Sequence, residues 1–233
     1  MNAIATDVWQ VHGPGLRMPG GAVIPTSSTV IRLPDRSLLV YSPIDFDDAA
    51  AAALDGAGEV AHLVVPSRLH HLFAGAAKAR WPRATVHAAP GVAEKQPALA
   101  IDRELGGGGD GAPWGDAVAS ELIGGAPKAN EVVLFHRPSG TLVCADLLFH
   151  VTRPANLRTR MVLAMMGTGG GRLAQSRAWR VLRKDRDAAR ASVARLLEWP
   201  IARVAPCHGE PAEIDGAGLA GHMTRLCGGR VAP

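Results

Sequence analysis

Apolar and polar positions along the first half of the chain predict short strands and helices that alternate. Residues 4–12 alternate in polarity, as a half-buried strand does, and the continuous apolar run at 60–65 is typical of a strand buried on both faces. A Pro-Asp-Arg turn joins two further apolar runs, so we expect a hairpin there. The predicted strands are 4–12, 29–33, 37–41, 60–65 and 85–88, and the predicted helices are 45–54 and about 72–80.

The second half repeats this organisation after a glycine-rich stretch. Residues 105–116 contain four consecutive glycines, and we interpret them as a loop between two halves of one domain that spans 1–233. The predicted strands that follow are 119–123, 131–136, 141–145 and 202–205, and the predicted helices are 172–184 and 186–198. Strand pairs with interspersed helices favour an α/β fold of two packed sheets with helices outside.

Composition and charge narrow the class of partner. The chain carries 25 basic and 21 acidic residues, and its sequence pI is near 9.3. A basic balance can favour nucleic acid, anionic lipid or an anionic small molecule. The arginines between 172 and 195 alternate with leucine and valine as on a solvated helical face, and few aromatic residues lie among them. We therefore expect a small-molecule substrate or ligand and disfavour nucleic acid.

Targeting and redox signals point to the cytoplasm. The N-terminus shows neither a basic leader nor a sustained apolar segment, and the three cysteines form no paired framework. No apolar run approaches the length needed to cross a bilayer, so we expect no membrane partner. The short apolar run at 161–166 would either cover a pocket mouth or form a subunit contact.

Four residues that follow predicted strands form the candidate site. His70 and His71 come shortly after the strand at 60–65, Asp146 directly after the strand at 141–145, and His208 shortly after the last strand. Loops beyond strand ends are where α/β folds assemble their sites. Three imidazoles and a carboxylate suit zinc, with iron or manganese as alternatives. Three other histidines have no partner that spacing identifies: His62, His87 and His222.

In several ordered features the chain resembles the metallo-β-lactamase superfamily, and in particular an uncharacterised bacterial branch of it. The resemblance rests on Tyr-Ser-Pro-Ile at 41–44, Pro-Ser-Arg-Leu-His-His at 66–71, Asp146, and His-Gly at 208–209. It implies an αββα sandwich, with two mixed sheets, helices outside and metals bound between the sheet edges.

The chain departs from the superfamily's metal-binding motif, His-x-His-x-Asp-His. Pro66 and Arg68 occupy the first two histidine positions, His70 stands in place of the aspartate, and a further histidine expected near 124–126 is missing. By this resemblance the first metal site is lost. The second would survive as His70, His71, Asp146 and His208.

These observations support three hypotheses. The first is a hydrolase of an ester, thioester, lactone or phosphoester with one metal ion, with His70 and Asp146 as catalytic residues. In this hypothesis, His70 is either a fourth metal ligand or an acid–base group of the pocket. Ser67 and Arg68 contact the substrate, and one form of the hypothesis makes that substrate an anion. The second is an inactive member that binds a small ligand or a protein partner; in its metal-free form Arg68 pairs with Asp146. The third, a nucleic-acid-binding protein, lacks a recognisable module.

Overall fold

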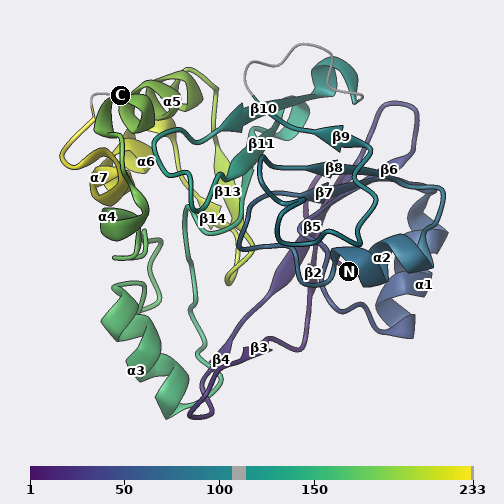
Figure 1. Ribbon diagram of the computed structural model, residues 1–233, viewed down its shortest axis with the longest axis horizontal. Helices are drawn as coiled ribbons and strands as arrows, with labels where there is room; N and C mark the ends of the chain where they lie inside the picture. Colours follow the sequence, from purple (N-terminus) through teal and green to yellow (C-terminus); the bar gives the residue numbers. More distant parts are fainter. Residues whose placement is uncertain (107–113, 232–233) are drawn as a thin grey trace.

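Two β-sheets packed against each other form the centre of the molecule, and helices cover their outer faces (Figure 1). The computed structural model describes residues 1–106 and 114–231. The seven strands of the first sheet are, in spatial order, β1 (Asn2–Ala5), β2 (Val8–His12), β5 (Ser27–Arg32), β6 (Leu38–Tyr41), β7 (Val60–Val65), β8 (Thr85–Ala88) and β9 (Arg103–Glu104). A separate small hairpin consists of β3 (Leu16–Arg17) and β4 (Val23–Ile24).

The second sheet has five strands, with most of the helices beside it. In spatial order its strands are β10 (Val118–Leu122), β11 (Val132–His136), β12 (Thr141–Cys144), β13 (Arg203–Pro206) and β14 (Ala212–Glu213). The helices are α1 (Asp48–Ala57), α2 (Ala74–Arg80), α3 (Leu157–Met166), α4 (Trp179–Leu182), α5 (Arg186–Leu197), α6 (Gly216–His222) and α7 (Thr224–Cys227). Figure 1 shows α1 and α2 beside the first sheet, and α5 to α7 beside the second. The predicted α/β architecture is confirmed.

Several predicted elements need correction. The run at 4–12 is two antiparallel strands, because Asp7 has a φ of 59° and turns the chain between them. Of the helix predicted at 172–184, only α4 is helical. The apolar run at 161–166 belongs to α3, which Asn156 caps and Gly167 ends in a left-handed conformation. The loop predicted at 105–116 lies mostly outside the described residues.

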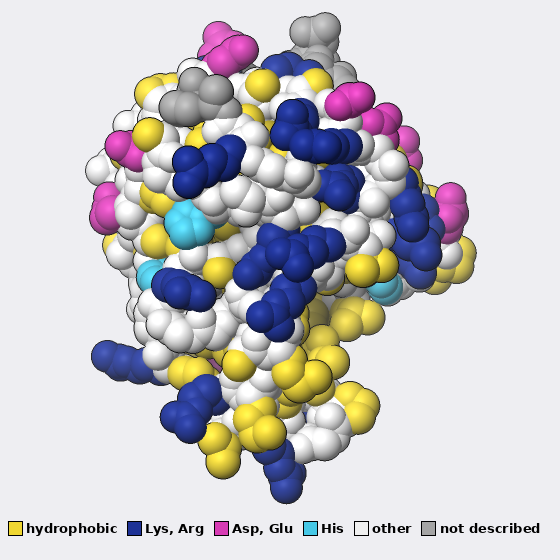
Figure 2. Space-filling view, turned by 90° about the vertical axis from the view of Figure 1, so that its left-hand side faces the viewer, with side chains coloured by type: hydrophobic (Ala, Val, Ile, Leu, Met, Phe, Trp, Pro, Cys, Tyr) yellow, Lys and Arg dark blue, Asp and Glu magenta, His cyan; other side chains and the backbone are white. Residues whose placement is uncertain are grey.

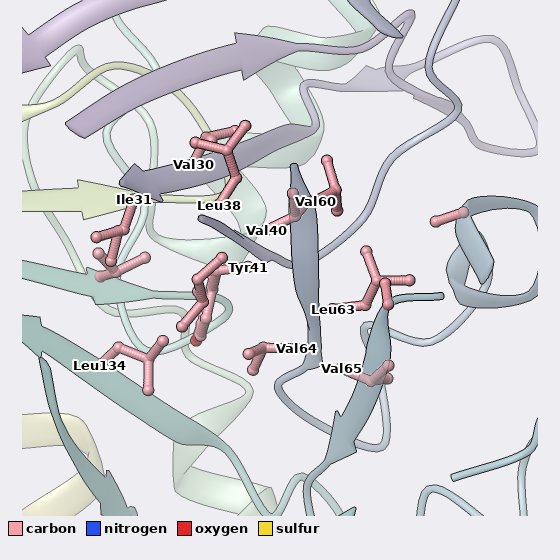
Figure 3. Packing of buried hydrophobic residues seen from close by; sticks show 14 of the residues in the cluster. Val30, Ile31, Leu38, Val40, Tyr41, Val60, Leu63, Val64, Val65 and Leu134 are labelled. Carbon is pink, nitrogen blue, oxygen red and sulfur yellow. The ribbon is translucent and has the colours of Figure 1, made fainter. Parts of the chain in front are cut away.

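Tyr41 joins the two sheets through the core. Its side chain is fully buried, and its hydroxyl donates a hydrogen bond to the carbonyl of Val132, at 2.8 Å. Figure 3 shows Tyr41 between the aliphatic side chains of the first sheet and Leu134 of β11. A second apolar cluster, which includes Val193 and Leu196 of α5, fills the space between the second sheet and its helices.

Parallel pairing brings strand ends of both sheets to one edge. β6 and β7 are parallel in the first sheet, and β12 and β13 are parallel in the second, where Cys144 pairs with Pro206. Backbone bonds tie the loops beyond these ends to strands of the opposite sheet, from Ser27 N of β5 to Cys207 O and from Val132 N of β11 to Pro66 O, both at 2.8 Å. The predicted site residues lie in these loops. Within the described ranges, no helix is long and apolar enough to span a membrane.

Candidate metal centre

His70, Asp146 and His208 converge beyond the strand ends of the two sheets. Nε2 of His70 lies 3.1 Å from Nε2 of His208 and 3.3 Å from Oδ2 of Asp146. Nε2 of His208 lies 3.3 Å from Oδ1 of Asp146. In the part of the chain that the structure describes, these three residues are the group whose ligand atoms lie within 4.8 Å of one another. Asp146 and His208 meet because each follows one of two paired parallel strands by two residues.

The backbone orients His208 toward this centre. Its Nδ1 lies 2.7 Å from the carbonyl oxygen of Pro25, which can only accept a hydrogen bond. Nδ1 therefore carries the proton, and in the neutral ring the lone pair is on Nε2, which faces Asp146 and His70. The ring of Phe149 stacks on that of His208, with centroids 4.5 Å apart and planes 16° from parallel. These contacts present His208 as a ligand nitrogen.

The lone pair of His208 and the carboxylate of Asp146 face each other, and two such acceptors need a cation between them. Oδ2 of Asp146 is buried and, among the described residues, has no hydrogen-bond partner. Burial opposes the charge of Asp146, but the positive charge and hydrogen bonds of His70 and His208 in their protonated forms outweigh it and hold the pKa of this carboxyl well below its usual range. A carboxylate facing an imidazole lone pair calls for a metal ion or for a proton on His70.

The donor set and its spacing fit one metal ion. Two imidazoles and a carboxylate are a common ligand set of zinc, iron and manganese enzymes. Bonds of about 2.0–2.1 Å in a tetrahedral site place neighbouring ligand atoms about 3.3 Å apart. The three measured separations are 3.1, 3.3 and 3.3 Å. Three protein ligands leave a fourth position for water or substrate, as catalytic sites require.

Glu131 supports the loop that carries Asp146, and its role was not predicted from the sequence. Its side chain is fully buried, and its two carboxylate oxygens accept from the backbone N–H groups of Ala145 and Asp146, at 2.7 and 3.0 Å. Burial and the charge of Asp146 raise the pKa of Glu131 to about 8. Glu131 is the first residue of the strand predicted at 131–136, and nothing in the local sequence marks its role, since only folding brings it against 145–146.

Three other predicted site residues point elsewhere. Nδ1 of His71 lies 2.9 Å from the Gln96 amide, and His71 is not part of the group of three. Arg68 forms an ion pair with Glu94 at 2.8 Å, so the expected Arg68–Asp146 pair is wrong: the charged partners of Asp146 are the two histidines.

Ser67 is fully buried, and its hydroxyl forms hydrogen bonds with the backbone of the turn in which it lies. Its Oγ accepts from the backbone N–H groups of Leu69 and His70, at 3.2 and 3.1 Å. These bonds hold the turn that positions His70, and the buried Ser67 side chain does not reach the surface where a substrate would bind.

A small apolar cavity of ≈ 60 Å³ opens beside His70 and His208. Its polar lining consists of these two histidines with Thr26, Ser27 and Ser42, and the rest of its wall is apolar: Leu16, Pro43, Ile44, Leu69, Leu72 and Phe73. The cavity places the exposed side of the centre against apolar side chains.

Three further histidines of the sheets, and Cys207, lie outside the group of three. His62 and His87, on neighbouring strands, lie 3.1 Å apart, from Nδ1 to Nε2. His136, the last residue of β11, is 2% exposed, and its Nδ1 lies 2.8 Å from Oγ of Ser139. Cys207 is fully buried, and burial raises the pKa of its thiol, so its environment opposes a thiolate nucleophile.

Solved structures of low sequence identity share the fold. A metallo-β-lactamase from Pontibacter korlensis matches with a TM-score of 0.65 and 16% identity over 97% of this chain and 97% of its own. A metallo-β-lactamase from Pseudomonas aeruginosa in a mono-zinc form matches with a TM-score of 0.59 and 15% identity, over 91% and 88% of the two chains. A metal-soaked flavodiiron core from Synechocystis matches with a TM-score of 0.62 and 13% identity, over 90% of this chain and 56% of its own.

Sequence comparison places the chain in a family. Among curated proteins, no sequence matches it. The model of a family described as "Domain of unknown function (DUF4336)" matches residues 20–162, which is more than half of the chain. The protein therefore belongs to the DUF4336 family, and its two sheets and helices adopt the metallo-β-lactamase fold.

Proposed function

We propose that this protein is a hydrolase that uses one divalent metal ion held by His70, Asp146 and His208. The supporting observation is the convergence of three ligand groups, with the carbonyl of Pro25 directing the lone pair of His208 toward Asp146. Zinc is the metal we favour, with iron and manganese as alternatives. A divalent ion bound there would supply Lewis acidity and activate water for hydrolysis.

The cavity wall favours an acyl substrate over a phosphorylated one. No Lys or Arg is present among the described residues that line the cavity, and Arg68 is paired with Glu94. A phosphoester would leave its charge without a cationic partner there. Leu69, Leu72 and Phe73 instead offer apolar contacts, so we propose a carboxylic ester, thioester or lactone with an apolar acyl part.

A route for a proton through Ser27 and His12 forms part of this proposal. Ser27 lines the cavity, and its Oγ lies 3.2 Å from Nδ1 of His12, an exposed residue at the end of β2. We propose that the hydroxyl of Ser27 binds the leaving group or water and that His12 exchanges the proton with solvent. His70 and His208 hold their positions through Ser42 and Pro25.

Elemental analysis of the untagged protein tests the metal site. The parent is expected to hold about one equivalent of zinc, iron or manganese after reconstitution, and the isosteric Asp146→Asn variant to lose it. His222→Ala is the matched control, because His222 lies on α6 outside the group of three. His71→Ala separates a three-ligand site, which keeps its metal, from the four-ligand site of the sequence prediction. A parent without metal would refute the proposal.

Hydrolysis tests the activity separately. The reconstituted parent should cleave p-nitrophenyl esters or lactones faster than it cleaves bis-p-nitrophenyl phosphate, and Asp146→Asn should reduce the rate by at least about 100-fold. Equal rates for the parent and this variant would contradict the role of the centre.

A ligand-binding protein without catalysis is the second candidate. It is favoured by the contacts at the lost ligand positions: Pro66 accepts a backbone bond from Val132, and Arg68 pairs with Glu94. These positions thus have structural roles. Metal binding without turnover of any ester, thioester or lactone would favour this candidate.

The cysteines support the cytoplasm as the compartment. Cys144, Cys207 and Cys227 are all free and buried. Free cysteines without disulfides are typical of proteins in a reducing environment.

A further inference from the structure

Exposed apolar side chains gather on three segments that are far apart in the sequence. Among the described residues, nine large hydrophobic side chains are exposed, and seven of them belong to residues 14–24, 66–73 and 152–166. We call these three segments the apolar surface. The seven side chains are Leu16, Met18, Leu69, Leu72, Leu157, Met161 and Met165. Because single exposed hydrophobics are normal and clusters are not, this clustering indicates an interaction site.

The β3–β4 hairpin connects the three segments. The backbone N–H of Val23 donates to Oγ1 of Thr159 at 2.8 Å, and the Asn156 amide donates to the carbonyl of Gly21 at 3.1 Å, so the hairpin packs against α3. On its other side, Leu16 lines the cavity together with Leu69 and Leu72. The apolar surface thus runs from the cavity mouth to α3.

Helix α3 exposes more apolar area than its packing requires. Leu163 is fully buried and packs with Ile24 and Val151, which anchors the inner face of the helix. Leu157, Met161 and Met165 follow at spacings of four residues, so they form a stripe on another face. Their exposed fractions are 61%, 58% and 74%. Figure 1 shows α3 and the hairpin standing off from the two sheets.

The three segments themselves carry basic but no acidic side chains, although Glu94 and Glu210 from neighbouring loops contact Arg68 and Thr152. Arg68 is paired with Glu94, whereas within the described ranges no ion pair holds the remaining arginines: Arg17, Arg153, Arg158 and Arg160. Figure 2 shows hydrophobic and basic side chains together on the lower part of the face in view.

From this arrangement we propose that the apolar surface docks on an anionic phospholipid bilayer. Protruding leucine and methionine side chains enter the boundary between headgroups and acyl chains, while arginines bind the lipid phosphates. A second copy of the chain fits less well, because the same unpaired arginines would face each other. The expectation of no membrane partner rested on the absence of a long apolar run, and a surface assembled from three segments contains no such run.

Docking at this surface would also bring lipid to the cavity beside the candidate metal centre, a consequence that rests on the proposed function. Leu16, Leu69 and Leu72 belong to both the cavity wall and the apolar surface. A lipid at this surface would have its chain at the mouth of the candidate metal centre. Docking itself requires neither metal nor turnover, so the Asp146→Asn variant should bind vesicles as the parent does.

Co-sedimentation with vesicles tests the proposal. The parent should bind vesicles of phosphatidylcholine with phosphatidylglycerol, bind pure phosphatidylcholine weakly, and release as salt rises. The double variant Met161→Gln, Met165→Gln should bind the anionic vesicles at least about tenfold more weakly. Val181→Gln is the matched control, because Val181 is 73% exposed but lies on α4, outside the three segments. Leu157→Gln provides a second variant if the double variant does not fold.

Three results would overturn the proposal. The first is a parent that fails to sediment with anionic vesicles, and the second is a double variant that sediments as well as Val181→Gln. The third is a parent that binds no vesicles but forms a dimer in analytical ultracentrifugation, with the double variant a monomer, which would assign the surface to a second copy of the chain.

Discussion

Oγ of Ser42 lies 2.9 Å from Nδ1 of His70, so a residue at the end of β6 orients an imidazole in the loop after β7. The backbone N–H of Ser42 donates in turn to the carbonyl of Val64 at 2.9 Å, which ties this contact to the first sheet. Asp146 and His208 come from the second sheet. The centre therefore depends on how the two sheets are aligned, and Ser42 transmits that alignment to His70.

Removing the hydroxyl of Ser42 should weaken metal binding. A partner of this kind fixes the orientation of a ligand histidine, and its loss typically lowers affinity by about 10–100-fold. We expect this decrease for Ser42→Ala in a competitive zinc titration. Ser28→Ala is the control, because Ser28 is equally buried but its Oγ donates to the carbonyl of Tyr41. Equal affinities of the two variants would show that Ser42 does not position His70.

Glu131 should matter for stability more than a typical carboxylate. Glu131→Ala leaves the N–H groups of Ala145 and Asp146 without their acceptor inside the core, so we expect a loss of at least about 2 kcal/mol in the free energy of unfolding. Glu213→Ala is the comparison, since Glu213 is exposed and pairs with Arg203 at the surface, so its loss should cost less than about 1 kcal/mol. Urea denaturation measures both, and similar losses would contradict the role of Glu131.

Because His87 is buried, we expect the free energy of unfolding to decrease in mild acid. Burial, and then the neighbouring His62, lower the pKa of His87 from 6.5 to about 4. The folded protein therefore holds His87 neutral, and its unfolding free energy falls as the pH drops from about 6.5 towards 4. At about 1.4 kcal/mol per pH unit, this contributes up to about 3 kcal/mol.

The variant His87→Phe isolates this effect. It keeps an aromatic ring beside Trp114, whose ring centroid lies 5.1 Å from that of His87, but it cannot titrate. Urea denaturation at pH 7 and pH 4.5 should show a smaller difference in unfolding free energy for the variant than for the parent. Identical pH dependence in both would place the acid sensitivity elsewhere.

Leu72 should set the preference for acyl length in the proposed reaction. It lines the cavity and is 55% exposed, so Leu72→Gln changes the wall without burying a polar group. We expect kcat/KM for p-nitrophenyl hexanoate to fall by roughly tenfold, since about 0.8 kcal/mol is lost for each methylene that leaves apolar contact, while p-nitrophenyl acetate changes little. A parallel decrease for both esters would contradict an acyl site at Leu72.

The local pattern of apolar and polar residues predicted most of the strands of this protein. Period-two alternation and continuous apolar runs located most strands of both sheets, because strand polarity is a local property of the chain. The same pattern placed His70, Asp146 and His208 just beyond strand ends. Helix α3 was missed, although Asn156 and Gly167 are its capping residues, because apolar residues lie on two of its faces.

Side-chain direction and distant partners were decided only by the tertiary structure. His70 and His71 are adjacent in sequence, yet one faces Asp146 and the other Gln96, since the turn held by Ser67 directs them apart. The proton of His208 is set by Pro25, which is 183 residues away in the chain. Sequence by itself therefore located most of the strands, to within a residue or two, and the residues that follow them. Which of them meet depended on the packing of two sheets, because contacts between residues so far apart form only when the chain folds.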